Sequence, residues 1–217
     1  CEIFAANGVT PLAVGDKNLW TSVHLFENVI LARLGPEKYS QLWKGEASFL
    51  SPEFEEAIVT FVKLLDFVNS DHGALSWDQA SEYMLEGICA MTNVGDWTEG
   101  LFRSIGLELG EDYGYVVFPD TQSTFCWLSD TFVLPKNAPH RQAALDWLEL
   151  CASVEGQDLF NPKKGSIPAR IDTDQSLYPE YLQYTMKDFA EDTLVGSVTH
   201  LVAVEEEWLN SLLNVVN

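Results

Sequence analysis

The chain has 217 residues, of which 47% are hydrophobic and 12% are aromatic. These proportions exclude an intrinsically disordered or collagen-like chain and supply enough apolar residues for a sizeable core. The 33 acidic and 12 basic side chains give a formal net charge of −21. Because so large a negative charge repels phosphate groups, nucleic acids and anionic lipid surfaces are disfavoured as partners.

The four cysteines predict neither a metal site nor a disulfide framework. Cys1, Cys89, Cys126 and Cys151 have no CxxC spacing and no histidine at metal-ligand intervals, so we expect buried free thiols and no zinc. One long-range disulfide stays open, because sequence alone does not fix the distance between two Cα atoms. No apolar run approaches the roughly 20 residues that a membrane-spanning helix needs.

The first part of the chain predicts a strand and then a helix. Residues 9–14 form a short apolar run between glycines, which predicts a buried strand. Apolar side chains then recur at helical spacing over residues 21–34, and Gly35 with Pro36 predicts the end of that helix. A second short helix carrying Trp43 follows.

Two later helices begin with capping signals. Ser51 precedes a proline, which is typical of an N-cap, and apolar residues from 54 to 68 predict one buried face. Ser76 and Gln79 fit a capping box for a helix that ends near residue 87. Residues 88–94 predict a buried strand.

Few strands and many helices are expected in the second half. The runs 113–118 and 126–134 are rich in aromatic and β-branched residues and are each closed by proline, so both predict strands. A loop is expected over residues 163–170. Helices are predicted around residues 141–151, 154–160, 179–190 and 202–215. The alternation predicts a helix-rich α/β fold.

The sequence contains no GxGxxG, P-loop, HExxH or GxSxG motif, so nothing in it favours an enzyme. Loops after strands instead combine Trp, Asp, Lys and His, a mixture suited to a polyhydroxylated ligand with apolar faces. Asp96 and Trp97 directly follow the strand predicted over residues 88–94. Asp96 either caps the next helix or faces a ligand with Trp97, whose indole offers a rigid surface and a donor.

Asp130 lies within the apolar run 127–133, where an ionised carboxylate is costly unless it is paired. It either accepts hydrogen bonds from sugar hydroxyls or is satisfied by the backbone of a bend. The basic segment 163–170 offers Lys164 as a donor to a hydroxyl, while Arg170 is expected to anchor the loop to an acidic neighbour. Generic salt bridging in so acidic a chain is the alternative.

Three further residues have both a structural and a functional interpretation. His200 lies between a turn expected at Gly196 and the last helix. A single histidine in such a place is more often structural. Trp20 and Trp77 are either core aromatics or platforms for a sugar ring.

Four segments in chain order resemble the sugar-binding proteins of ATP-binding-cassette importers, and among these the glucose/mannose-binding subgroup. The segments are VTPLAVG at 9–15, GDW at 95–97, SDTF at 129–132 and KGSIPAR at 164–170. The last is the most specific, and the resemblance extends over nearly the whole chain.

The resemblance implies a periplasmic-binding-protein fold, in which two α/β lobes joined by a hinge close on a sugar. It places three residues at hydrogen-bonding positions, namely Asp130, Lys164 and His200. It places four residues near the aromatic platform, namely Trp20, Trp77, Asp96 and Trp97. Leu201 stands where the family often has a glycine after this histidine, so a different local turn is expected.

Family members are about twice as long, which implies a fragment that lacks most of the N-terminal lobe. Residues 1–117 and 161–217 are then the two parts of the C-terminal lobe, and residues 118–160 cross the hinge toward the absent lobe. This arrangement leaves an apolar face for the missing N-terminal lobe or a second chain to cover.

The expected function is that of the substrate-binding component of a carbohydrate importer. It binds a hexose or small oligosaccharide between two lobes and delivers it to membrane permease subunits, with no cofactor and no catalysis. The expected location is periplasmic or extracellular, with membrane association through the transporter or a lipid anchor outside this chain. Cys1 is not expected to be that anchor, because it leads directly into a strand.

Two alternatives stay open. A carbohydrate-active enzyme could use Asp96 and Asp130 as a carboxylate pair, and the chain could be a non-catalytic acidic interaction domain. The sequence does not choose between glucose, mannose, a disaccharide and another polyol.

Overall fold

The computed structural model describes residues 1–216, and the chain divides into two compact units. The first unit comprises Cys1–Gly95, Asp112–Leu128 and Asp192–Asn217. The second comprises Asp96–Glu111 and Ser129–Glu191. Each unit is therefore assembled from segments that are far apart in the sequence, and each is described by itself.

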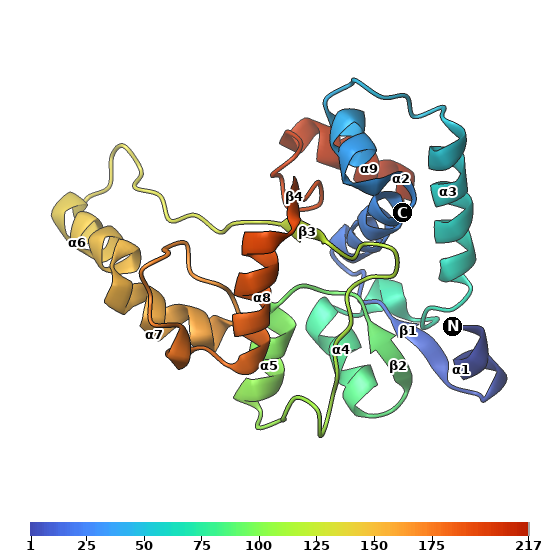
Figure 1. Cartoon of the computed structure of the whole chain (residues 1–217), viewed down its shortest axis with the longest axis horizontal. Helices are drawn as coiled ribbons and strands as arrows, with labels where there is room; N and C mark the ends of the chain where they lie inside the picture. The colour runs from blue at the N-terminus through green and yellow to red at the C-terminus, as the bar shows by residue number, and fades with distance from the viewer. Residues whose placement is uncertain (217) are drawn as a thin grey trace. The chain divides into compact units, whose positions relative to one another are not determined.

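The strands of the first unit form two small parallel sheets (Figure 1). β1 (Thr10–Ala13) pairs with β2 (Cys89–Thr92), with Thr10 opposite Cys89. β3 (Thr124–Trp127) pairs with β4 (Thr193–Gly196), so that the last residues of these two strands lie opposite each other. Short parallel strands among many helices confirm the predicted helix-rich α/β class.

The long helix α2 (Trp20–Trp43) contains a kink where the sequence predicts a stop. Gly35 has φ of 73° and ψ of 168°, which are not helical angles, and the helix resumes at Pro36. At the other end, the buried carboxylate of Asp16 accepts hydrogen bonds from the Thr21 hydroxyl at 2.8 Å and the Ser22 amide at 3.0 Å. The two predicted helices are thus the two arms of one kinked helix.

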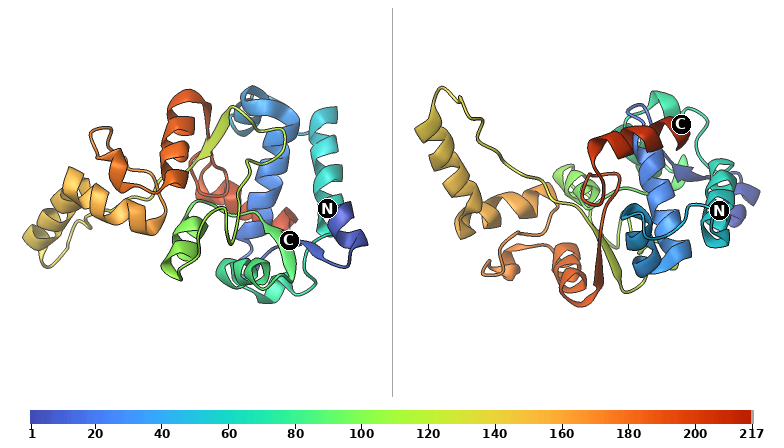
Figure 2. Two further views of the ribbon diagram at one scale, coloured as in Figure 1. Left: turned by 60° about the horizontal axis from the view of Figure 1, so that its bottom comes forward. Right: turned by 90° about the horizontal axis from the view of Figure 1, so that it is seen from above.

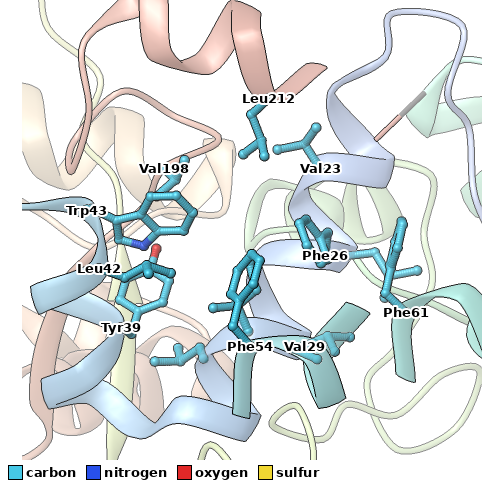
Figure 3. Packing of buried hydrophobic residues seen from close by; sticks show 14 of the residues in the cluster. Val23, Phe26, Val29, Tyr39, Leu42, Trp43, Phe54, Phe61, Val198 and Leu212 are labelled. Carbon is cyan, nitrogen blue, oxygen red and sulfur yellow. The ribbon is translucent and has the colours of Figure 1, made fainter. Parts of the chain in front are cut away.

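The core of the first unit lies around α2, against which α3 (Pro52–Leu65) and α9 (Glu206–Val216) pack. Figure 3 shows aromatic and aliphatic side chains of these helices meeting, with the rings of Phe26 and Phe61 4.9 Å apart. The buried face predicted for residues 54–68 is wrong in part. Ile58, Val62 and Leu65 are exposed, whereas Phe54 and Phe61 are buried.

Both predicted helix starts are confirmed. The Ser51 hydroxyl accepts a hydrogen bond from the Phe54 amide at 3.3 Å, before Pro52. In α4 (Trp77–Leu85), the side-chain amide oxygen of Gln79 accepts a hydrogen bond from the Ser76 backbone amide at 2.9 Å, as a capping box requires. The remaining elements of the first unit are short, namely α1 (Glu2–Ala6) and the 3₁₀ helix η1 (His72–Ala74).

The second unit contains only helices within the described chain. They are α5 (Trp97–Ser104), α6 (Arg141–Ala152), α7 (Val154–Lys164), the 3₁₀ helix η2 (Gln175–Leu177) and α8 (Glu180–Glu191). α7 packs on α5 and on α6, and Figure 2 shows α6 and α7, in yellow and orange, following each other directly. Gly100 of α5 permits a close approach, since a Cβ there would lie 2.4 Å from the carbonyl oxygen of Lys164.

Several predicted bounds are wrong. Residues 113–118 form no strand, although Phe118 packs against the core. The strand predicted over 126–134 is β3 and ends at Trp127, because its partner β4 ends opposite at Gly196 and the chain turns away there. Helix α7 extends through Lys163 and Lys164, where a loop was expected, and α9 begins at Glu206, four residues later than predicted.

All four cysteines are free thiols, as predicted, but only Cys89 is buried. Cys126 and Cys151 are partly exposed, and Cys1 is exposed. In the part of the chain that the structure describes, no helix combines the length and the apolar character needed to cross a membrane.

Candidate functional site

Trp20, His24 and His200 form an aromatic cluster in the first unit. Trp20 and His24 lie one turn apart on α2, and their ring centroids are 6.1 Å apart. His200 follows β4, and its ring centroid lies 5.6 Å from that of Trp20 and 5.5 Å from that of His24. The structure therefore brings together two predicted site residues, Trp20 and His200. It adds His24, which the i, i+4 spacing from Trp20 could have indicated.

His24 is held in its neutral form at neutral pH. Burial lowers its pKa to about 4, and His200 adds to that lowering, while the Glu27 carboxylate acts in the opposite direction. Its Nδ1 atom is buried without a hydrogen-bond partner among the described residues. The cluster thus presents a neutral imidazole beside an indole, a surface suited to the apolar face of a ligand ring.

The turn that carries His200 differs from the prediction. Gly196 belongs to β4, and the reversal comes after it, where the Leu201 amide donates to the Val198 carbonyl at 3.1 Å. Leu201 has φ of 60°, in the left-handed region that favours glycine. The left-handed residue thus follows His200, at the position where the family often has a glycine, although Leu201 led us to expect a different local turn.

Trp77 is the first residue of α4 in the first unit and is half-buried. The loop after β1 approaches it closely, since a Cβ on Gly15 would lie 2.8 Å from the Trp77 amide nitrogen. The loop after β1 therefore packs tightly against the start of α4.

In the second unit, Lys164 and Asp130 form an ion pair of 2.5 Å between Nζ and Oδ2. Lys164 ends α7 and is followed by Gly165 in the left-handed conformation, whereas Asp130 lies in an irregular segment with 64% of its side chain exposed. Asp130 is thus balanced by a lysine, which is the kind of salt bridging given above as the alternative role of the basic segment. A pair this exposed adds little to stability.

Asp96 does not cap α5, which was one of the two roles left open for it. It stands at the N-cap position of α5, next to Trp97, but its side chain makes no capping hydrogen bond. Its carboxylate instead accepts from the Tyr181 hydroxyl of α8 at 2.8 Å. Burial raises the pKa of Asp96, and the Tyr181 hydrogen bond and the charge of Lys164 oppose that rise. Tyr181 was not predicted, because only the fold brings α8 to this loop.

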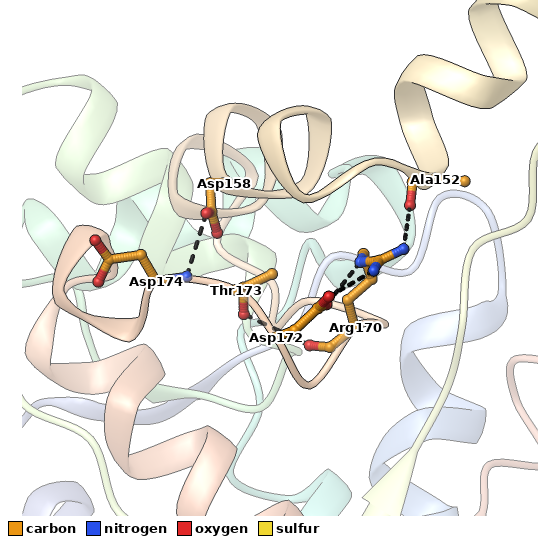
Figure 4. A network of polar contacts seen from close by, with 6 residues as sticks. All are labelled: Ala152, Asp158, Arg170, Asp172, Thr173 and Asp174. Atoms are coloured by element: carbon orange, nitrogen blue, oxygen red, sulfur yellow. Dashed lines mark hydrogen bonds and ion pairs between the residues drawn. The ribbon is translucent and has the colours of Figure 1, made fainter.

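Arg170 anchors its loop as predicted (Figure 4). Its guanidinium donates to both carboxylate oxygens of Asp172, at 2.7 and 2.6 Å, and to the Ala152 carbonyl at 3.0 Å. Farther along, the Asp174 amide donates to the Asp158 carboxylate at 3.2 Å. These bonds tie the segment after Lys164 to the end of α6 and to α7.

Across residues 1–216, no group of three His, Cys, Asp or Glu side chains could hold a metal ion.

Residues 2–158 match the family described as bacterial extracellular solute-binding protein, and the chain belongs to that family. An uncharacterized ABC transporter extracellular-binding protein of Pyrococcus horikoshii is 37% identical over an alignment of 218 residues. The alignment covers 100% of this chain and 49% of that protein. A probable sugar-binding periplasmic protein of Brucella suis is 29% identical over 98% of this chain and 52% of its own length.

Solved structures show the same fold. The bacterial solute receptor AcbH, described as preferring β-D-galactopyranose, superposes with a TM-score of 0.82 at 16% identity, over 99% of this chain and 56% of the receptor. A chitin oligosaccharide binding protein superposes with a TM-score of 0.73 at 15% identity, over 58% of its chain.

These similarities confirm the fold class and the importer-type family of binding proteins, and they contradict the enzyme alternative, since the family binds solutes without catalysis. The chain spans about half the length of the relatives it matches.

Proposed function

We propose that this chain is part of the substrate-binding component of a carbohydrate ABC importer, which acts in the periplasm or outside the cell. It binds a hexose or small oligosaccharide and delivers it to membrane permease subunits. The family and the sugar-binding relatives support the class of ligand. The observation that carries the proposal on this chain is the exposed ion pair of Asp130 and Lys164. These two residues lie in the segments SDTF and KGSIPAR, which resemble those of sugar-binding proteins.

An exposed carboxylate and ammonium suit a sugar. Each can exchange part of the ion pair for hydrogen bonds to neighbouring hydroxyls, the carboxylate as acceptor and the ammonium as donor. Because the pair is open to water, little stability is lost when it rearranges. We assign Asp130 and Lys164 to the hydroxyls on this basis, and His200 by the resemblance.

The aromatic residues would supply the apolar part of the site. Trp20 beside His24 and His200 offers flat surface for a sugar ring. Trp77 of the first unit, and Asp96 and Trp97 of the second, are assigned to sugar binding by the resemblance alone. Glucose or mannose is the preferred ligand within this proposal, because the resemblance is to that subgroup.

A second lobe outside this chain would complete the cleft. The relatives are about twice as long, and α6 buries none of its side chains here. Apolar residues of the second unit are exposed, among them Val133, Trp147 and Leu159. We propose that residues 118–160 cross toward the N-terminal lobe and that this lobe, rather than a second chain, covers the exposed apolar side chains of this segment.

The test is the thermal midpoint of the chain in the presence of D-glucose, D-mannose, D-galactose, D-xylose and their disaccharides. A sugar at a hundredfold excess over its dissociation constant stabilises the native state by about 2.7 kcal/mol. Asp130→Ala is expected to abolish that shift. Glu53→Ala is the matched control, because it breaks the exposed Lys38–Glu53 ion pair of 2.6 Å outside the proposed site.

The same sugars are then tested on a longer chain, in which this chain is preceded by an N-terminal lobe like that of its relatives. A shift seen only there would show that the second lobe is required. If no sugar shifts either chain, the proposed function is wrong. If Glu53→Ala removes the shift as Asp130→Ala does, the assignment of Asp130 to the sugar is wrong.

A further inference from the structure

Glu27 is a buried carboxylate that the predicted site did not include. It lies on α2 with 2% of its surface exposed. Its oxygens accept hydrogen bonds from the backbone amides of Val198 at 2.5 Å and Thr199 at 3.3 Å. They also accept from the hydroxyls of Thr199 at 2.6 Å, Ser197 at 3.0 Å and Tyr39 at 2.5 Å.

Most of these donors belong to the three residues immediately before His200. A buried carboxylate is costly unless it is hydrogen-bonded, and here no lysine or arginine of the described chain pairs with it. The buried Glu27 carboxylate is therefore stabilised by hydrogen bonds from neutral donors, chiefly those of Ser197, Val198 and Thr199. Glu27 in turn satisfies the amides of Val198 and Thr199, which would otherwise need another acceptor.

The network extends to His200 through Ser197. The Ser197 hydroxyl donates to Glu27 and accepts a hydrogen bond from the His200 amide at 3.2 Å. On the other side, Glu27 lies on the same helix as Trp20 and His24, at i+7 and i+3 from them. One carboxylate thus links the helix that carries two rings of the aromatic cluster to the loop that carries the third.

We propose that Glu27 is a positioning residue that holds the His200 loop against α2 and so sets the place of the imidazole beside Trp20. The contribution to sugar binding rests on the proposed function, whereas the hold on the loop does not. Glu27 is not a ligand contact in this proposal. It acts through Ser197 and the amides of Val198 and Thr199.

The first test needs no sugar. Glu27→Gln keeps the shape of the side chain but replaces one acceptor oxygen by a donor that faces other donors. Amide hydrogen exchange at residues 198–200 is measured under native conditions in the Glu27→Gln variant and in the Asp16→Asn variant, and the two rates are compared. Asp16 is also a buried carboxylate at α2, but its acceptor bonds go to Thr21 and Ser22.

We expect exchange in the loop to rise by about tenfold or more in Glu27→Gln relative to Asp16→Asn, when the two variants are compared at equal global stability. An equal rise in both would overturn the proposal, because Glu27 would then only stabilise the unit as a whole. If Glu27→Gln fails to fold, Ser197→Ala removes the link to His200 and leaves Glu27 in place. Exchange of the His200 amide must then rise.

The second test is a double-mutant cycle with a sugar that shifts the wild-type chain. If Glu27 acts through His200, then Glu27→Gln and His200→Ala each weaken binding, and the double variant is no weaker than His200→Ala alone. Fully additive losses would overturn the role in binding. If no sugar binds the wild-type chain, the proposed function fails while hydrogen exchange still decides the hold on the loop.

Discussion

At the scale of single residues, two buried carboxylates lie at α2, Asp16 just before the helix and Glu27 on it, and neither forms a salt bridge among the described residues. Asp16 is satisfied at the start of the helix and Glu27 by the loop after β4. Backbone amides and hydroxyls replace the water that each carboxylate loses, which is why the burial is tolerated. His24, one turn before Glu27, is instead kept neutral by burial.

The pKa of His24 predicts a loss of stability in acid. Because its pKa is near 6.5 in the unfolded chain and about 4 in the folded one, the unfolded state binds more protons between these values. Stability is therefore lost as the pH falls from about 6.5 toward 4. The free energy of unfolding falls between pH 7 and pH 4.5. We expect this fall to be smaller in His24→Gln than in the wild type, by about 1 to 3 kcal/mol.

The measurement is urea unfolding at both pH values. His140→Gln is the control, since that histidine is exposed and lies in the second unit, at the N-cap of α6. Equal losses in wild type and His24→Gln would contradict the prediction.

At the scale of elements, the connection from β4 to α9 is the feature that departs most from expectation. β4 pairs with β3, after which residues 197–199 bond to Glu27 and the chain reverses. The reversal uses Leu201 in the left-handed conformation. A side chain in that conformation costs about 1 to 2 kcal/mol relative to the right-handed helix.

Leu201→Gly is therefore expected to raise the free energy of unfolding by about 1 kcal/mol relative to Leu201→Ala. Both substitutions remove a side chain that is 48% exposed, so their difference isolates the backbone conformation. Thermal unfolding of the two variants measures it. A Leu201→Gly variant less stable than Leu201→Ala would show that residue 201 does not adopt the left-handed conformation.

At the scale of the whole molecule, the half-length match to relatives and the exposed apolar side chains point to the same conclusion. α6 has an apolar face but no buried residue, and Trp147 on it is 57% exposed. Exposed apolar residues in such a group are typical of a surface that another domain covers. We propose the N-terminal lobe as that domain.

Trp147→Glu distinguishes a covered face from a free one. In this chain the substitution is expected to change the free energy of unfolding by less than about 0.5 kcal/mol, as surface substitutions do. In the longer chain with the N-terminal lobe, it is expected to cost about 2 kcal/mol, because a charge would then enter an apolar contact. Leu50→Glu, at a side chain 94% exposed in the first unit, is the control. A small effect in both chains would contradict covering by that lobe.

Local signals in the sequence determined much of this protein. The caps at Ser51 and Ser76, the break at Gly35 and the anchoring by Arg170 depend on neighbours a few residues away, or on charge pairing in an adjacent loop. Such contacts exist wherever the chain folds locally, so their residue types predict them. The ordered segments likewise indicated the family.

Only the tertiary structure decided what depends on distant partners. Residues 113–118 have strand-forming side chains but no neighbouring strand, and β3 ends where β4 ends. Glu27 meets a loop 170 residues later in the chain, and Asp96 meets Tyr181 of α8. A sequence records which donors and acceptors exist, but hydrogen bonds form over about 3 Å. The fold therefore selects which of them are partners.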